Sequence, residues 1–341
     1  MNFFMGCFGS TTGARVENED RVGPETLVKR YKWEEIERYT MKFREVIGVG
    51  GYSRVYLAKF PNLTFGAIKV YNNCSERLNQ VFKSELEISQ MLNHPNIVKL
   101  LGYCHDKDEG ALVFEYIPKG NLQEKLHNNK DNQNNNANTH YLTWKQRMKI
   151  AYQLAKALDY LHDLQIVHGD IKGSNLLLDE NLNCILCDFG FAKMGFSSMI
   201  KPPSSSRISI IGTPGYIDPH FLMTGIASKK SDVYSFGVIV LELITGLQAY
   251  ICSGEREVLL TLIVKNKERF DFETLVKLID PRIVRNENVD MEEVKVMGEI
   301  AASCLHYLPS LRLTSSEICK LFQDKISYIS DVLVISKKTE V

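Results

Sequence analysis

One short stretch, residues 168–175, gathers three side chains that suit the transfer of a phosphoryl group. Asp170 can orient a hydroxyl and accept its proton, Lys172 can balance phosphate charge, and the amide oxygen of Asn175 can ligate Mg²⁺. A second acid, Asp188, follows an apolar run and precedes a Phe-Gly turn, which suits a metal ligand. Each cluster alone is equally typical of a polar loop, but their order and spacing together favour a site.

A lysine and a glutamate upstream of these clusters are predicted to form an ion pair. Lys69 interrupts a strand-like apolar run, where a charged side chain usually lies on the solvent face. Glu85, however, falls within the apolar stripe of a helix predicted over residues 76–93, at about 100° per residue. A carboxylate on a buried face needs a cationic partner, and Lys69 is the nearest candidate along the chain. Glu87 lies well round the helix and is expected to be solvated.

A glycine-rich turn, residues 48–55, precedes Lys69 and lies between two predicted strands. Such a turn lets backbone N–H groups approach a phosphate without obstruction by side chains. On its own the pattern more often marks an ordinary hairpin, because that is where glycine is usually found.

The elements that must position these residues begin with a β-rich part. β-Branched and aromatic residues dominate residues 43–71 and predict several short antiparallel strands. Two further apolar runs, 97–103 and 111–117, follow the predicted helix. Residues 118–121 then form a natural linker, so a hinge is expected near 115–120.

The chain after this hinge is predicted to be mainly helical. A capping box at Thr143 begins a long amphipathic helix. Residues 231–245 are apolar nearly all round and end at Gly246, which predicts a helix buried on every side. The polar tract at 128–138 is expected to be a surface insert.

Composition excludes several classes of protein. The 341 residues contain 41 Lys plus Arg and 41 Asp plus Glu, which argues against a dedicated nucleic-acid binder. The longest mainly apolar stretch, 236–244, already contains Glu242 and is far short of a transmembrane span. Eight scattered cysteines indicate free thiols in a reducing cytosol.

With these motifs in this order, the chain resembles a eukaryotic-type protein kinase over residues 41–325. The matching positions are Gly48, Gly50 and Val55 in the glycine-rich loop; Ala67, Ile68 and Lys69 in the strand; Glu85 in the helix; His168, Asp170, Lys172 and Asn175 in the catalytic loop; Asp188, Phe189 and Gly190 in the magnesium loop; residues 212–216 and 232–237; and Arg312.

The resemblance implies an α+β fold of two lobes, a small β-rich N-lobe (41–117) and a larger helical C-lobe (118–325). Residues 1–40 are then a flexible tail, to about residue 30, and a lead-in helix, and 326–341 are a C-terminal tail. It also implies MgATP as the phosphoryl donor, with Asp170 as base, Lys172, Lys69 and Glu85 as further catalytic residues, and Asn175 and Asp188 as metal ligands. The nucleotide would contact Gly48, Val49, Gly50, Gly51, Val55, Ala67, Lys69, Glu115, Ile117 and Cys187.

Three positions depart from the family pattern. Ser53 replaces the third loop glycine and still tolerates a tight turn. Gly169 stands where most members have an arginine that pairs with a phosphate on the activation segment, so that switch is expected to be missing or weak. His220 replaces a glutamate whose family partner matches Arg312, so Arg312 needs another acceptor or solvent and a stability penalty is expected.

Finer motifs, such as residues 94–98 and 100–104, resemble the plant receptor-like and Pelle-type branch, and Lys172 follows the serine/threonine pattern. The expected function is a cytoplasmic serine/threonine kinase that acts on protein substrates, with a membrane receptor kinase as a candidate partner. The alternative is a kinase-like scaffold, which Gly169 and His220 motivate and the intact catalytic set disfavours.

The N-terminal tail carries one further motif. If translation begins at Met5, Gly6 fits a myristoylation site and Cys7 a palmitoylation site, which together would anchor the chain at the plasma membrane. A plain Gly/Ser-rich tail explains these residues equally well.

Overall fold

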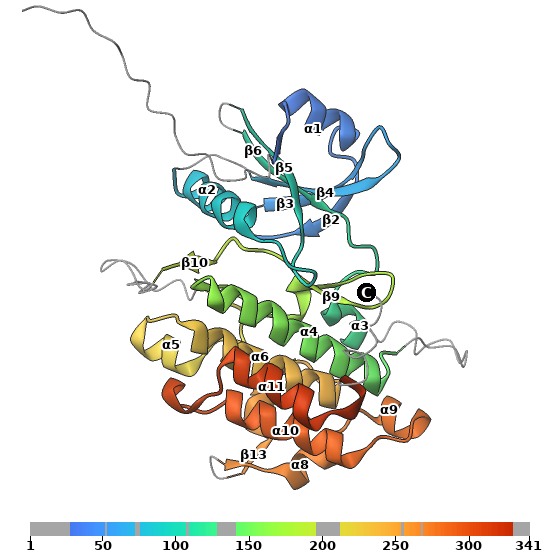
Figure 1. Cartoon of the computed structure of the whole chain (residues 1–341), viewed down its shortest axis with the longest axis vertical. Coiled ribbons are helices and arrows are strands. Elements are labelled where there is room, and N and C mark those ends of the chain that lie inside the picture. Colours follow the sequence, from blue (N-terminus) through green and yellow to red (C-terminus); the bar gives the residue numbers. More distant parts are fainter. Residues whose placement is uncertain are drawn as a thin grey trace, which may run out of the picture.

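A computed structural model describes residues 28–51, 53–71, 76–106, 109–127, 141–195, 212–253, 256–266 and 269–329 of the chain. Figure 1 shows a sheet-containing lobe stacked on a larger helical lobe. This is the α+β arrangement of two lobes that the sequence predicts. The polar tract at 128–138 and the Gly6/Cys7 motif lie outside the described residues.

The N-lobe is built on a six-stranded sheet in the order β1-β5-β6-β4-β3-β2, and only β1 and β5 pair in parallel. Its strands are β1 (Lys29–Arg30), β2 (Val46–Val49), β3 (Ser53–Lys59), β4 (Phe65–Tyr71), β5 (Leu100–Asp106) and β6 (Glu109–Glu115). The two helices of this lobe are α1 (Trp33–Tyr39) and α2 (Glu76–Met91).

Strand alternation gives the sheet two apolar faces with separate cores. On β6, Leu112 and Phe114 belong to the large core that includes Phe82 of α2, whereas Val113 belongs to a smaller core with Ile36 of α1. Successive side chains of a strand point to opposite faces, so each helix covers one face of the sheet. The same alternation on β4 places residues 69 and 71 on the α2 side.

The packed lobes extend beyond the boundaries predicted from the sequence. Residues 29–30, assigned to the end of the tail, form strand β1 beside Gly102 and Tyr103. Tyr31 and Ile36 then bury against the sheet, so the N-lobe core begins well before residue 41. At the other end, Ile326 and Ile329 are 0% and 2% exposed, respectively, within the C-lobe core, although the C-terminal tail was predicted to start at 326. These apolar residues are too few to show a helical or strand periodicity in the sequence, but each packs into a hydrophobic core.

The C-lobe contains the helices α3 (Leu122–His127), α4 (Trp144–Asp163), α5 (Pro219–Thr224), α6 (Lys229–Thr245), α7 (Leu260–Ile263), α8 (Phe272–Lys277), α9 (Pro281–Asn286), α10 (Met291–Cys304) and α11 (Ser315–Lys325). Short strand pairs join β7 (Ile166–Val167) to β10 (Lys193–Met194), β8 (Leu176–Leu178) to β9 (Cys184–Leu186), β11 (Tyr250–Ser253) to β12 (Arg256–Leu259), and β13 (Lys265–Asn266) to β14 (Arg269–Phe270).

Two helices form the frame of this lobe as predicted. Helix α4 begins with the expected capping box at Thr143, whose side chain accepts from the Gln146 N–H. Helix α6 is buried over most of its length and ends at Gly246 in the left-handed conformation. The carboxylate near its C-terminal end, Glu242, is buried but satisfied, because it accepts hydrogen bonds from the Tyr216 hydroxyl (2.8 Å) and the Ala249 N–H (2.9 Å). Among the described residues, no helix is both long and apolar enough to cross a membrane.

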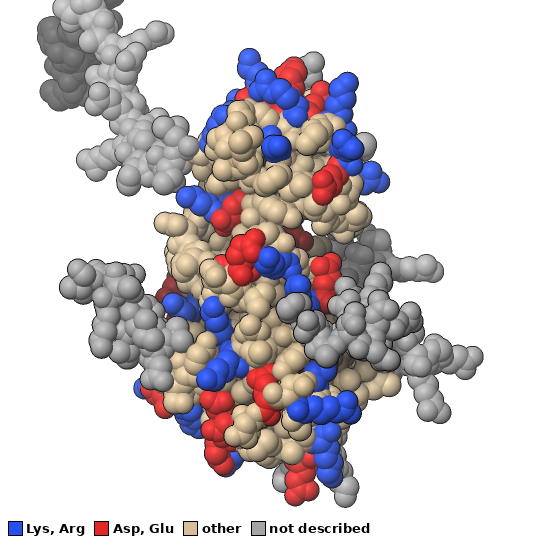
Figure 2. Space-filling model, turned by 90° about the vertical axis from the view of Figure 1, so that its right-hand side faces the viewer, with Lys and Arg blue, Asp and Glu red and all other residues tan. Residues whose placement is uncertain are grey.

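The lobes are also joined through the loop that follows α2. The Val98 N–H donates to the Leu186 carbonyl (3.0 Å), and the Leu186 N–H donates to the Asn96 carbonyl (2.9 Å). Strand β9 is therefore held between the lobes, directly before Asp188. On the face in Figure 2, Lys and Arg are interspersed with Asp and Glu, in keeping with the equal totals of the two signs.

Candidate active site

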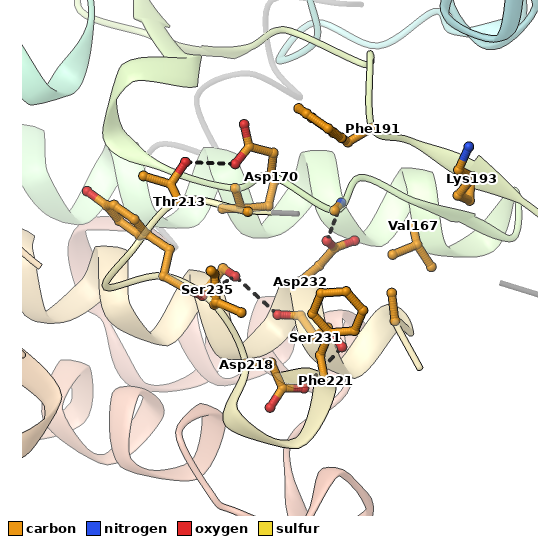
Figure 3. Close-up of a pocket in the computed structure, with 16 residues that line it drawn as sticks. Val167, Asp170, Phe191, Lys193, Thr213, Asp218, Phe221, Ser231, Asp232 and Ser235 are labelled. Atoms are coloured by element: carbon orange, nitrogen blue, oxygen red, sulfur yellow. Dashed lines mark hydrogen bonds between the residues drawn. The ribbon is translucent and has the colours of Figure 1, made fainter. Parts of the chain in front are cut away.

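A buried carboxylate binds the backbone of the loop that carries Asp170. Asp232, in the first turn of α6, accepts hydrogen bonds from the backbone N–H groups of His168 (2.8 Å) and Gly169 (2.9 Å). It is 1% exposed and also contacts the His162 ring at 3.2 Å. Figure 3 shows Asp232 pointing toward the backbone of this loop. In the sequence, Asp232 is recognisable only as a carboxylate within a mainly apolar helix. The Gly169 N–H from which it accepts lies 63 positions earlier in the chain.

Asp170 lies at the centre of a small polar cluster. Its carboxylate contacts the Lys172 ammonium at 2.6 Å and accepts from the Asn175 amide at 3.2 Å. The Asn175 amide also donates to the Asp170 carbonyl (2.9 Å), which fixes the turn between the two residues. The three side chains proposed from the sequence thus meet at one point.

Thr213 belongs to this cluster, and the sequence analysis assigned it no such role. Its hydroxyl donates to Asp170 (3.0 Å) and accepts from Lys172 (3.0 Å), so it bridges the two. Figure 3 shows the hydroxyl directed at the Asp170 carboxylate. In the sequence, only the motif at residues 212–216 marks this threonine. Its contact with Asp170 spans more than 40 positions, and such a contact leaves no local sequence pattern.

Asn175 and Asp188 come together because β8 and β9 form an antiparallel hairpin. Leu176 pairs with Leu186, and the Cys187 N–H donates to the Asn175 carbonyl at 3.0 Å, which leaves Asp188 one residue further along. Asp188 has a backbone φ of 67°, a left-handed conformation that is uncommon outside glycine and often marks functional sites.

The donor chemistry of this pair fits Mg²⁺, which prefers carboxylate and amide oxygens together with substrate phosphates. The Asp188 side chain is 37% exposed, so part of the carboxylate faces the open side of the site. Burial alone would raise the pKa of Asp188, but the Lys69 ammonium overrides that effect and lowers it to about 2. The carboxylate is therefore ionised, as a metal ligand must be.

The predicted ion pair between Lys69 and Glu85 is present. The ammonium lies 2.8 Å from both carboxylate oxygens of Glu85 and 2.7 Å from Asp188. Burial alone would lower the pKa of Lys69, but these two carboxylates raise it well above its usual value. Glu85 is 1% exposed, as its place in the apolar stripe predicts, whereas Glu87 is exposed. The hydroxyl of Tyr71 also donates to Glu85, a contact that the sequence analysis did not anticipate.

The residues predicted to contact the nucleotide lie on the elements around this cluster. Gly48 and Val49 end β2, and the Gly50 N–H donates to the Ser53 carbonyl (2.9 Å), which forms the predicted turn. The positions along the remaining elements are Gly51 in the same turn, Val55 on β3, Ala67 on β4, Glu115 at the end of β6, Ile117 two residues after β6, and Cys187 after β9. Burial raises the pKa of the Cys187 thiol, so it remains protonated at neutral pH.

The structure explains why glycine suits position 169. Its φ is +80°, and a Cβ there would lie 3.2 Å from the carbonyl oxygen of Phe191. Glycine adopts this conformation without penalty, whereas other residues pay for it. The loop keeps its hydrogen bonds to Asp232 without a side chain at this position.

Arg312 pairs with an acceptor other than residue 220. This pairing offsets the stability penalty expected from His220. Both oxygens of Asp218 accept from the Arg312 guanidinium at 2.7 Å, and the two side chains are 1% and 0% exposed, respectively. Arg312 also donates to the carbonyls of Lys230 (2.8 Å) and His306 (2.7 Å). The acid that pairs with Arg312 therefore lies at position 218, two residues before His220.

Comparisons with known proteins agree with this geometry. The protein kinase domain family matches residues 41–322. A probable receptor-like protein kinase of Arabidopsis thaliana is 45% identical over 312 residues, which cover 87% of this chain and 88% of that protein. Salt tolerance receptor-like cytoplasmic kinase 1 of Oryza sativa subsp. japonica is 42% identical over 311 residues, or 89% of this chain and 82% of the relative. Calcium/calmodulin-regulated receptor-like kinase 2 of Arabidopsis thaliana is 32% identical over 294 residues, or 85% and 62% of the two chains, respectively.

Proposed function

This chain belongs to the protein kinase family, and we propose that it transfers the γ-phosphoryl group of ATP to serine and threonine hydroxyls of proteins. The observation that carries the proposal is the cluster of Asp170, Lys172 and Thr213, in which an acid and an ammonium share one hydroxyl. The position of Lys172, two residues after Asp170, supports serine/threonine specificity within the family.

Each side chain of the site has a role in this proposal. Asp170 orients the substrate hydroxyl and accepts its proton, and Lys172 steadies the phosphoryl group during transfer. Lys69 binds the phosphates of ATP, and Glu85 holds the Lys69 ammonium in place. Asn175 and Asp188 would hold Mg²⁺, which neutralises charge on the phosphates when bound.

The competing function is a kinase-like scaffold without activity. Gly169 and His220 are the residues that suggest it. However, the Gly169 N–H still donates to Asp232, and Arg312 is paired with the Asp218 carboxylate. The paired state of Lys69 and Glu85 also favours the enzyme, because a pure scaffold has no need for a buried ion pair beside a metal-binding acid.

The proposal is tested with the purified full chain, radiolabelled ATP and Mg²⁺, followed by phosphoamino acid analysis of a general protein substrate. We expect label on serine and threonine, and none with the Asp188→Asn variant. Asp179→Asn is a matched control, because Asp179 lies in the same β8–β9 hairpin but only caps its turn. Label on tyrosine alone would contradict the specificity, and equal incorporation by Asp188→Asn would contradict the site.

A cytoplasmic location next to a membrane receptor kinase belongs to the same proposal. Relatives named as receptor-like kinases support it, and acylation of Gly6 and Cys7 after initiation at Met5 would supply two anchors. Cell fractionation of a Met5-initiated protein and its Gly6→Ala variant tests this part. Membrane recovery that is lost in the variant supports it, and equal recovery of both rules out myristoylation.

A further inference from the structure

Tyr71 occupies the strand position that lies beside Lys69 on the α2 face of the sheet. They lie two positions apart on β4, so alternation turns both side chains the same way. Tyr71 is 2% exposed, and its ring packs edge-on against Phe82 of α2 at 5.4 Å between centroids. The Lys69 ammonium lies 5.4 Å from the centre of the same ring. The ring therefore fills the space between the strand lysine and the helix.

The hydroxyl of Tyr71 donates a hydrogen bond to the Oε2 atom of Glu85. Burial raises the pKa of Tyr71 well above its usual value, so the hydroxyl keeps its proton and donates. Glu85 thus receives two donors from the same strand, Lys69 and Tyr71.

The two donors differ in what else they bind. The Lys69 ammonium is shared between Glu85 and Asp188, at 2.8 and 2.7 Å. Bound phosphates would draw on the same three protons, because an ammonium has no further donors. The Tyr71 hydroxyl donates to Glu85 and, among the described residues, to no second carboxylate.

We propose that Tyr71 is a positioning residue for phosphoryl transfer, which together with Lys69 keeps Glu85 and helix α2 docked on the sheet. The inference rests on the proposed function. The bond joins strand β4 to helix α2 directly.

The test compares Tyr71→Phe with the wild type and with Tyr152→Phe. The first variant keeps the buried ring and removes only the hydroxyl. The control also removes a hydroxyl from a nearly buried ring, one that accepts from Gln323 at 2.8 Å on α11, far from Glu85 in the fold. We expect kcat to fall about tenfold in Tyr71→Phe, with KM for ATP changed less than about twofold, since a hydrogen bond to a charged group is lost. Equal kcat in Tyr71→Phe and the wild type would overturn the proposal.

A double-variant cycle separates positioning from general stability. If Tyr71 acts through Glu85, then adding Tyr71→Phe to Glu85→Gln costs less than about twofold further in kcat. Full additivity of the two losses would instead assign Tyr71 a structural role and overturn the proposal.

Amide hydrogen exchange over residues 81–91 gives a readout that does not depend on activity. We expect faster exchange of this part of α2 in Tyr71→Phe and no change in Tyr152→Phe. Unchanged exchange in Tyr71→Phe contradicts the proposal. A wild-type chain that transfers no phosphate would instead contradict the proposed function, and the exchange data would still decide the role of Tyr71.

Discussion

Lys69 is the residue on which the site depends most, because its ammonium neutralises two carboxylates at once. Glu85 and Asp188 lie within 2.8 Å of it, and the low pKa of Asp188 follows from that contact. Without the cation, the two acids would repel each other and Asp188 would bind a proton more readily. The parts of the site proposed to bind metal and phosphate are therefore coupled through one side chain.

We expect Lys69→Met to reduce phosphoryl transfer by at least about a hundredfold, the scale of losing one preorganised electrostatic contact. The fold is expected to persist, since methionine retains the buried stem of the side chain. The measurement is kcat with far-ultraviolet circular dichroism as a check on folding. Lys59→Met, on the exposed end of β3, serves as the control and should keep full activity. Full activity in Lys69→Met would reject the site.

At the scale of elements, the Arg312–Asp218 pair ties the end of the activation segment to the C-terminal part of the chain. Asp218 also caps helix α5, accepting from the His220 N–H at 2.9 Å, and accepts from the Ser231 hydroxyl at 3.0 Å. One carboxylate thus joins α5, α6 and the stretch before α11. Its burial makes the pair costly to break, because either partner alone would be an uncompensated charge.

Arg312→Ala is therefore expected to lower the free energy of unfolding by about 3–5 kcal/mol. His220→Glu restores the residue typical of the family, yet we expect no gain in stability, because Asp218 and nearby backbone carbonyls already accept from the whole guanidinium. Chemical denaturation of the three proteins measures both effects. A gain of more than about 1 kcal/mol in His220→Glu would mean that Asp218 is an incomplete substitute.

The loop between α2 and β5 contains a histidine that must stay neutral. Burial and then the nearby Lys156 lower the pKa of His94 to about 4, and its Nδ1 atom accepts from the Asn96 N–H at 3.1 Å. Its ring also stacks on Tyr160 at 5.1 Å. The unfolded chain binds this proton near the ordinary pKa of about 6.5, so protonation favours unfolding.

The stability of the protein is expected to decline as pH falls from about 6.5 to about 4, with a His94 contribution of up to one proton taken up on unfolding. Above that range this contribution is constant. The slope of unfolding free energy against pH, compared with His94→Gln, isolates it. An identical slope in the variant would show that His94 does not carry the effect.

At the scale of the whole molecule, docking of the lobes and of the catalytic loop relies on contacts that need no side chain at position 169. Strand β9 is bonded to the loop after α2, and Asp232 holds the catalytic loop through its backbone. Gly169 offers no cation for a phosphate. The hydroxyls that the sequence offers for phosphorylation in this segment include Ser204, Ser205, Ser206 and Ser209, which lie outside the described residues, and Thr213, whose hydroxyl is hydrogen-bonded within the site.

Basal activity is accordingly expected to depend little on phosphorylation of the activation segment. Phosphatase-treated protein should retain most of its kcat, measured over an initial interval too short for self-phosphorylation. A hundredfold loss that rephosphorylation restores would show that another cation replaces the missing arginine.

The sequence by itself determined the chemistry and most of the elements. Periodicity located α2, α4 and α6, and the polar position within the apolar stripe of α2 identified Glu85 and its partner Lys69. These features are local, because helix and strand periods and capping residues act over a few positions.

Only the tertiary structure decided which distant residues complete the site. Thr213, Asp232 and Tyr71 each form hydrogen bonds with residues of the proposed site that lie 14 to 64 positions away along the chain. Asp218 and Arg312 are paired across 94 positions. A hydroxyl or carboxylate can satisfy its hydrogen bonds in many places, and its identity alone does not select one. The packing of β4 on α2, and of the activation segment on α6, makes that selection, since it alone brings these groups within bonding distance.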